Sequence, residues 1–259
     1  MTTRRSVLLV LLGLSTLGCD SSAPPARDGG MALPPGEGCN SVRLTSYEVF
    51  AGGWCEVPRD LPVLPAFVRE EGLTAAMAEP FAGGYYGGEL GEACGECWEI
   101  DTLTATRTVM VMDLCPNEGN PLCQGGHFHI DLASEAASIL MAGGLDEARA
   151  RRVPCPVEGS VQVYVNDENY SYLRLAFVNA RVPVRRAWVR STAPGSPEIA
   201  LRRSGGAWEA ADDTPLDRGG EGVTFIVESV QGERLEVERG DPAHPPFLHL
   251  RSRRAVRGP

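Results

Sequence analysis

The chain has 259 residues and is acidic, with 34 Asp and Glu residues, 24 basic residues that are all arginine, and a formal net charge of −10. Such a balance argues against nucleic acid as a partner, because neutralising phosphates requires a basic face. The charge is also uneven: residues 39–156 carry 17 acidic and 7 basic side chains, whereas residues 157–259 carry 14 of each. This asymmetry, with a length of about 220 residues after the N-terminal segments, predicts two domains.

The N-terminus is typical of an export signal. Two arginines precede an apolar run over residues 7–12, which is too short to span a membrane. Cys19, directly after Gly18, resembles the acylated cysteine of a bacterial lipoprotein signal, so we expect residues 1–18 to be removed and Cys19 to carry lipid. A plain cleaved signal with an ordinary cysteine is the alternative. Residues 19–38 are rich in Pro, Gly, Ser and Ala and are expected to form a flexible tether, which leaves the protein membrane-anchored or secreted.

The first domain shows strand patterns around one helix. Strands are expected over residues 43–50, 98–102 and 107–113, a short helix over 134–141, and an exit from the domain over 148–155. Alternation along the third strand places Asp113 on the same face as Val109 and Val111. The stretch 61–88 has no clear period, and its glycine-rich segment around Tyr85 and Tyr86 is expected to form a loop over a groove, where both tyrosines could contact a ligand.

The second domain consists of short runs of aromatic and β-branched residues separated by turn residues. Strands are expected over 161–165, 172–178, 184–189, 199–202, 223–230, 235–238 and 247–250. Seven short strands in about a hundred residues indicate a β-sandwich of immunoglobulin-like shape, which we place at 157–254 with a tail at 255–259.

Eight cysteines in an exported chain favour disulfides over metal sites. A four-thiolate zinc site has plausible spacing and is the competing interpretation, with Cys94, Cys97, Cys115 and Cys123 as ligands. Because the expected compartment is oxidising, neither a metal nor a cofactor is predicted.

Four sequence blocks in the first domain carry a family resemblance: Ala-Cys-Gly-Glu-Cys-Trp-Glu-Ile at 93–100, Val-Met-Asp-Leu-Cys-Pro at 111–116, His-Ile-Asp-Leu at 129–132 and Arg-Arg-Val-Pro-Cys at 151–155. In this order and spacing they resemble the six-stranded double-psi β-barrel of expansins. The resemblance implies a mainly all-β protein, with this barrel at 39–156 followed by a carbohydrate-binding sandwich. It also implies three disulfides, which leave Cys39 over: Cys55–Cys94, Cys97–Cys155 and Cys115–Cys123.

The same resemblance implies the site residues. Asp131 matches the family aspartate that faces the polysaccharide groove, Asp113 matches the second acidic position of microbial expansins, and Thr45 matches the groove threonine. His129, in the same block as Asp131, is a further candidate for contact with substrate. A structural alternative for Asp131 is capping of the helix that follows it.

Hydrolysis by inversion needs a general base as well as an acid. In the endoglucanases that share the barrel, the base position corresponds to Val49, and the neighbouring Glu48 would point to the opposite face of the strand. The resemblance therefore implies an expansin-like protein that binds and loosens cell-wall polysaccharide without hydrolysis. One alternative is a lytic enzyme, either a glucanase or a lytic transglycosylase of the rare lipoprotein A type, which needs an acid but no base. The other is a non-catalytic carbohydrate-binding protein.

The second domain departs from the aromatic row of microbial expansins. Two of the row positions correspond to Ser171 and Tyr172, and the third, near Leu216, is not aromatic. Tyr170 and Tyr172 lie on one strand face and are the expected stacking residues, whereas Trp188 and Trp208 are expected in the core. Four arginines would suit an acidic wall polymer instead: Arg181, Arg185, Arg186 and Arg190. The expected partner is thus cellulose, xylan or peptidoglycan, bound by a monomer, with the membrane reached only through Cys19.

Overall fold

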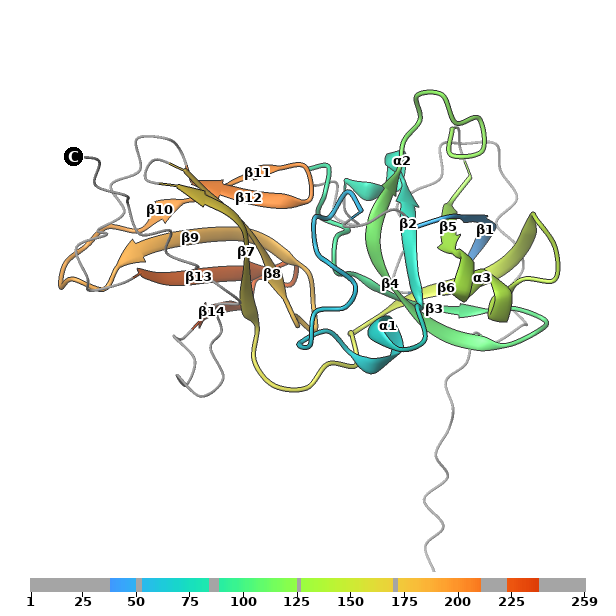
Figure 1. Cartoon of the computed structure of the whole chain (residues 1–259), viewed down its shortest axis with the longest axis horizontal. Helices are drawn as coiled ribbons and strands as arrows, with labels where there is room; N and C mark the ends of the chain where they lie inside the picture. Colours follow the sequence, from blue (N-terminus) through green and yellow to red (C-terminus); the bar gives the residue numbers. More distant parts are fainter. Residues whose placement is uncertain are drawn as a thin grey trace, which may run out of the picture.

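The computed structural model describes residues 38–49, 53–83, 89–124, 127–169, 172–210 and 223–237. A six-stranded barrel and a two-sheet sandwich lie side by side along the long axis of the molecule (Figure 1). The predicted signal, Cys19, the Tyr85–Tyr86 loop, Tyr170 and the strand at 247–250 fall outside the described residues. Within the described part of the chain, no helix is long and apolar enough to cross a membrane.

The first six strands form a closed barrel. They are β1 (Asn40–Tyr47), β2 (Thr74–Ala78), β3 (Cys97–Asp101), β4 (Thr106–Cys115), β5 (His129–Ala133) and β6 (Asp146–Val153). Their spatial order is β1-β5-β2-β4-β3-β6, in which β1 runs parallel to β5 and β2 runs parallel to β4. The expected mainly-β barrel is confirmed. The expected exit over 148–155 is wrong, because β6 pairs with both β1 and β3 and so closes the barrel.

Three short helices accompany the barrel: α1 (Ala66–Arg69), α2 (Glu79–Ala82) and α3 (Ser134–Leu140). The helix α3 follows β5 directly, its N-cap residue is Ala133, and no side chain caps it. Asp131 therefore belongs to β5, and the helix-capping alternative for its carboxylate is wrong.

Alternating residues of the strands fill the barrel interior. Leu44 of β1, Ile130 and Leu132 of β5, and Val109 and Val111 of β4 belong to one buried cluster. Since neighbouring residues on a strand point to opposite faces, the residues between them point away from this core. That second face is where Thr45 and Asp131 lie.

Residues after Gln162 form two four-stranded sheets. Their strands are β7 (Gln162–Asn169), β8 (Tyr172–Val178), β9 (Val184–Ser191), β10 (Ile199–Ala200), β11 (Arg202–Ser204), β12 (Ala207–Ala210), β13 (Val223–Ser229) and β14 (Arg234–Val237). One sheet has the order β10-β9-β13-β14 and the other β11-β12-β8-β7, which confirms the sandwich. Trp208 lies in its core as expected, packed against Phe177. Trp188 does not: it is half-buried, and the Arg234 guanidinium lies 4.7 Å from its ring centroid.

Disulfides link Cys55 to Cys94, Cys97 to Cys155, and Cys115 to Cys123, as the family resemblance implied. Every cysteine of the four-thiolate alternative is used in these bonds, so that zinc site is wrong. Cys39 is also disulfide-bonded, so the expectation that it is left over is wrong.

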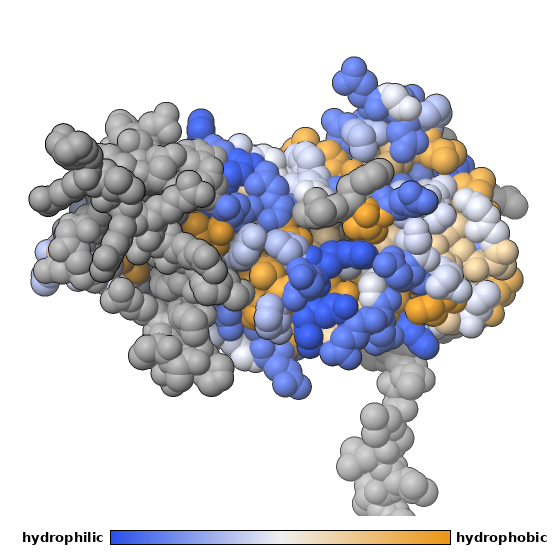
Figure 2. Space-filling model, in the orientation of Figure 1, coloured by the Kyte–Doolittle hydropathy of each residue, from blue (hydrophilic) through white to orange (hydrophobic). Residues whose placement is uncertain are grey.

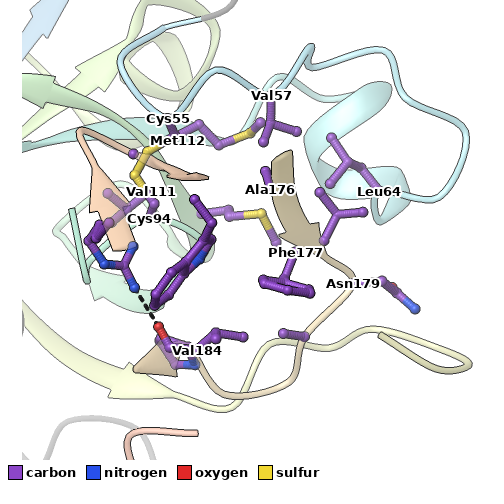
Figure 3. A pocket seen from close by; sticks show the side chains of 18 residues that line it. Cys55, Val57, Leu64, Cys94, Val111, Met112, Ala176, Phe177, Asn179 and Val184 are labelled. Atoms are coloured by element: carbon purple, nitrogen blue, oxygen red, sulfur yellow. Dashed lines mark hydrogen bonds between the residues drawn. A yellow bond between two sulfur atoms is a disulfide. The ribbon is translucent and has the colours of Figure 1, made fainter. Parts of the chain in front are cut away.

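Barrel and sandwich are joined by a polar and tightly packed junction. Arg174 of β8 pairs with Glu56 of the barrel, and the Asn166 side-chain amide donates to the Glu56 carbonyl at 2.9 Å. Figure 2 shows hydrophilic residues gathered along the middle of the visible face, where the two domains meet. Figure 3 shows Val57 and Met112 of the barrel facing Phe177 of the sandwich around a cavity of about 50 Å³. A ligand site normally measures ~300 Å³ or more, so this space is a packing gap.

Candidate functional site

Thr45, Asp131 and Asp113 lie in one row across four neighbouring strands. The strand registers pair Thr45 with Asp131, Asp131 with Ala76, and Ala76 with Asp113. Adjacent strands are ~4.8 Å apart, so the two aspartates are separated by about 10 Å of backbone with only a small alanine between them. The three predicted residues thus form one site on the outer face of the barrel.

A β-bulge brings Asp113 to this face. The pairing of β2 with β4 shifts from Ala75–Val111 to Ala76–Asp113, which leaves Met112 as the extra residue. Strict alternation would have kept Asp113 on the face of Val109 and Val111, which is the barrel core. The expected face was therefore wrong, and the bulge is the reason, since an extra residue reverses the side on which the following residues point.

Thr45 stands between a histidine and the principal acid. Its Oγ1 lies 2.7 Å from Nε2 of His129 and 2.6 Å from Oδ1 of Asp131. The other ring nitrogen of His129, Nδ1, contacts the backbone carbonyl of Leu122. All three side chains are nearly inaccessible, with exposed fractions of 4% for Thr45, 1% for His129 and 7% for Asp131. His129 therefore acts on the site through Thr45. Asp131 is the most exposed of the three and is the one that a ligand can contact directly.

The hydrogens of this chain can be counted. A carbonyl oxygen only accepts, so Nδ1 of His129 donates to Leu122, and Thr45 has a single hydroxyl hydrogen for its two short contacts. The second contact needs one more hydrogen. Either His129 is an imidazolium beside a carboxylate, or His129 is neutral and Asp131 is a carboxylic acid that donates to Thr45, which in turn donates to Nε2.

Burial favours the neutral pair. Loss of hydration raises the pKa of Asp131 above its usual range, and the nearby charge of Asp113 raises it further. The hydrogen bond from Thr45 and the charge of His129 lower it, but by less. Burial also lowers the pKa of His129, although the Leu122 carbonyl and Asp131 oppose the change. Charged forms are the ones that a desolvated site penalises, so burial shifts both groups toward their neutral forms.

Asp113 is held differently, by backbone donors. Its Oδ1 accepts hydrogen bonds from the backbone N–H of Trp54, at 2.6 Å, and from that of the next residue, Leu114, at 2.8 Å. Its carboxylate also accepts a hydrogen bond from the hydroxyl of Tyr47. Burial and the two nearby carboxylates raise the pKa of Tyr47 far above its usual range, so this phenol stays protonated and donates. The sequence analysis did not select Tyr47 as a site residue. Its place two residues after Thr45 on β1, and so on the same strand face, was the available signal.

The short disulfide loop forms a wall of the site. Cys115 Sγ lies 3.6 Å from Oδ2 of Asp131, and the loop that the Cys115–Cys123 bond closes includes Leu122, the acceptor for His129. The two sulfurs and the Asp131 carboxylate lie within 4.8 Å of one another, but sulfurs bonded to each other are not thiolate ligands. The loop therefore serves to position the acid.

The remaining candidates lie elsewhere. Glu48 is exposed and Val49 is half-buried, and both follow the end of β1, so neither belongs to the row. Tyr172 begins β8, on the far domain, with its side chain outside the described part of the structure.

Comparison with known proteins identifies relatives of the same kind. Expansin-like protein 1 of Dictyostelium discoideum is 30% identical over 153 residues, which cover 57% of this chain and 51% of that protein. Expansin-like protein 5 of the same organism is 30% identical over 141 residues, 45% of this chain and 58% of its own length. An expansin of Clavibacter michiganensis matches the fold over 80% of this chain and 93% of its own, with a TM-score of 0.60 and 22% identity.

The chain is similar to expansin-like proteins. The bacterial expansin shares the fold of this chain, and a mutant of that expansin, matching equally well, was solved in complex with cellohexaose. The chain spans about half the length of the two curated relatives described above. No protein-family model matches it.

Proposed function

We propose that this expansin-like protein binds cell-wall polysaccharide along the Thr45–Asp131–Asp113 row and loosens its noncovalent contacts without cleaving a bond. The observation that carries the proposal is an acid without a base: Asp131 is a buried carboxyl group whose pKa is raised by burial, and β1 brings Thr45 and Tyr47, but no carboxylate, to the same face. The cellohexaose complex of the Clavibacter mutant supports a glucan as the ligand class.

Asp113 is poorly suited to replace the missing base. Inversion requires a carboxylate free to hold and deprotonate a water. In this site, Asp113 already accepts two backbone N–H groups and the Tyr47 hydroxyl. Its free lone pairs, and Oδ2 of Asp131, can instead accept hydrogen bonds from sugar hydroxyls. Such bonds compete with those between neighbouring glycan chains, which is loosening rather than hydrolysis.

The test compares Asp131→Asn with the wild type in two assays. Cellulose paper should weaken mechanically with the wild type and at least ~10-fold less with the variant, since a hydrogen bond to a charged or strongly polar group is worth ~1.5–3 kcal/mol. Neither protein should release reducing sugar from soluble glucan. Asp101→Asn, at the far end of the β3–β4 hairpin, is the matched control and should behave as the wild type. Sugar release that the Asp131 variant loses would refute the non-hydrolytic proposal.

A lytic transglycosylase is the second candidate, because the raised pKa of Asp131 suits an acid that works without a base. It predicts anhydro-muropeptides from peptidoglycan, lost in Asp131→Asn. A purely carbohydrate-binding protein predicts instead that the variant binds and weakens paper as the wild type does.

Export completes the proposal. Three disulfides in the described residues suit an oxidising compartment outside the cytoplasm. We further propose that Cys19 is acylated in the mature protein, where the bond to the lipid takes the place of any disulfide of this thiol. Mass spectrometry of the mature N-terminus would detect the lipid. Tyr85, Tyr86, Tyr170 and Tyr172 stay proposed sugar contacts, and alanine substitutions would test them in the same paper assay.

A further inference from the structure

A second hollow, of about 590 Å³, lies between the barrel and the sandwich and shares no lining residue with the Asp131 row. Its walls come from the barrel turn at residues 89–92 and from β9 to β12 of the sandwich. Binding sites for small molecules usually have volumes of ~300–1,000 Å³, so the hollow has the size of a site.

The hollow is cationic although the protein is acidic. Four arginines line it, against Glu89 and Glu92, in a chain whose net charge is −10: Arg185, Arg186, Arg202 and Arg203. Like charges gathered in one concave surface raise the local potential and attract an anion. Of the four arginines that the sequence suggested for an acidic polymer, Arg185 and Arg186 line the hollow, whereas Arg181 and Arg190 do not. Arg190 pairs with Glu236 instead.

Three of these guanidinium groups have donors to spare. Arg185 has no ion-pair partner among the described residues. Arg186 and Arg202 each have a carboxylate partner, Glu228 and Glu209, but their side chains are 63% and 70% exposed. A guanidinium carries five N–H donors, so these side chains can bind a ligand carboxylate without losing the existing pairs.

Arg203 supplies a fixed charge at the base of the hollow. It donates to the carbonyls of Gly91, in the barrel, and Val184, in the sandwich, and stacks 4.2 Å from the Trp208 ring centroid. Carbonyl oxygens do not neutralise it, the charges of Glu92 and Glu89 offset it only in part, and its Nε is buried without a partner. Burial lowers the pKa of Arg203 to about 10, so it is still charged at neutral pH.

Glu92 gives the hollow an acceptor as well. The side chain is 4% exposed, and one oxygen accepts the Glu89 N–H at 3.2 Å, whereas the other is buried without a partner. A buried carboxylate oxygen without a donor is costly, and a ligand hydroxyl would satisfy it. A ligand that carries both carboxylates and hydroxyls fits this set, whereas sulfate would bring negative charge to Glu92 with no hydrogen to donate in return.

We propose that this hollow is a second carbohydrate site, which binds an acidic polysaccharide through the carboxylates of its uronic acid residues. Arg185 and Arg202 pair with the uronate carboxylates, Arg203 supplies the fixed positive charge, and Glu92 accepts a sugar hydroxyl. The site is independent of loosening at Asp131, and it would hold the protein on acidic wall polymers.

Calorimetric titration of the intact protein tests the proposal, with tetragalacturonate, cellotetraose and sodium sulfate as separate ligands. Tetragalacturonate should bind, more weakly as salt rises because the pairs are partly exposed. Arg185→Gln and Arg202→Gln should each weaken it ~10-fold, as expected for a lost charge-assisted hydrogen bond. Arg107→Gln, an exposed arginine of β4 outside the hollow, is the control and should leave binding unchanged.

The outcomes are separable from those of the first proposal. Asp131→Asn should leave tetragalacturonate binding intact even if it abolishes paper weakening. Equal affinity for sulfate, or for cellotetraose, would overturn the uronate assignment. Unchanged binding in both arginine variants, with melting temperatures like that of the wild type, would overturn the location.

Discussion

The barrel row and the junction hollow are built in opposite ways. Thr45, Asp131 and Asp113 reach one face through the registers of adjacent strands, and Thr45 and Asp131 are buried and joined by a short hydrogen bond. The hollow gathers residues of two domains, and the side chains of Arg186 and Arg202 in it are more than half exposed to water. The difference teaches that burial raises the pKa of the acid in the first site, whereas an excess of arginines suits the second site to an anion.

One long-range and one short-range disulfide of the barrel should differ in what they support: the first mainly the stability of the fold, and the second mainly the geometry of the site. Cys97–Cys155 spans 58 residues and Cys115–Cys123 spans 8. Replacing both cysteines of the first bond with alanine should lower the free energy of unfolding by ~4 kcal/mol, and of the second by ~3 kcal/mol, because the longer loop restricts the unfolded chain more. Urea unfolding measures both.

Cellohexaose binding should show the reverse order. Loss of the Cys115–Cys123 bond frees Leu122 and the Asp131 wall, so it should weaken cellohexaose binding more than loss of Cys97–Cys155. If binding followed stability instead, the loop would be a general stabiliser and not a wall of the site.

A smaller effect is expected at the junction, where Gly206 lies against the barrel. A Cβ at this position would lie 2.4 Å from the Cys55 Cα and 2.6 Å from the Trp54 carbonyl oxygen. Gly206→Ala should therefore cost ~1–3 kcal/mol of stability. Since Trp54 N–H holds Asp113, the variant should also weaken cellohexaose binding.

Gly144→Ala is the control, because nothing lies within 4 Å of its Cβ. Thermal melts of both variants measure their stability, and cellohexaose titrations measure their binding. Normal binding in a destabilised Gly206→Ala would show that the sandwich does not influence the groove.

The residues of the barrel row could be selected from the sequence because its motifs are local. The family blocks carry Asp113 and Asp131, and the barrel registers align them. Two features, the strand β2 and the bulge in β4, could not be predicted from the sequence, for physical reasons. The strand β2 reads Thr-Ala-Ala-Met-Ala, is buried on both faces, and has neither alternation nor β-branched residues after Thr74. The bulge at Met112 depends on pairing with β2, so no pattern within β4 shows it.

The hollow between the two domains could not be predicted from the sequence, for another reason. Glu92, Arg185 and Arg203 are far apart in the chain, and only the docking of the two domains brings them to one hollow. Counting arginines suggested an acidic ligand, but it selected Arg190, which the structure pairs with carboxylates.

The protonation of Asp131 tests the central claim most directly. Infrared difference spectra of the wild type against Asp131→Asn, between about pH 3 and pH 7, report whether this carboxyl is neutral or ionised. The structure predicts that it stays protonated above the usual aspartate pKa of ~3.9, and that its contribution to stability is full below that value and is lost as the pH rises through the raised pKa. Ionisation at or below the usual pKa would contradict the account, because Asp131 would then be a carboxylate beside an imidazolium and not an acid without a base.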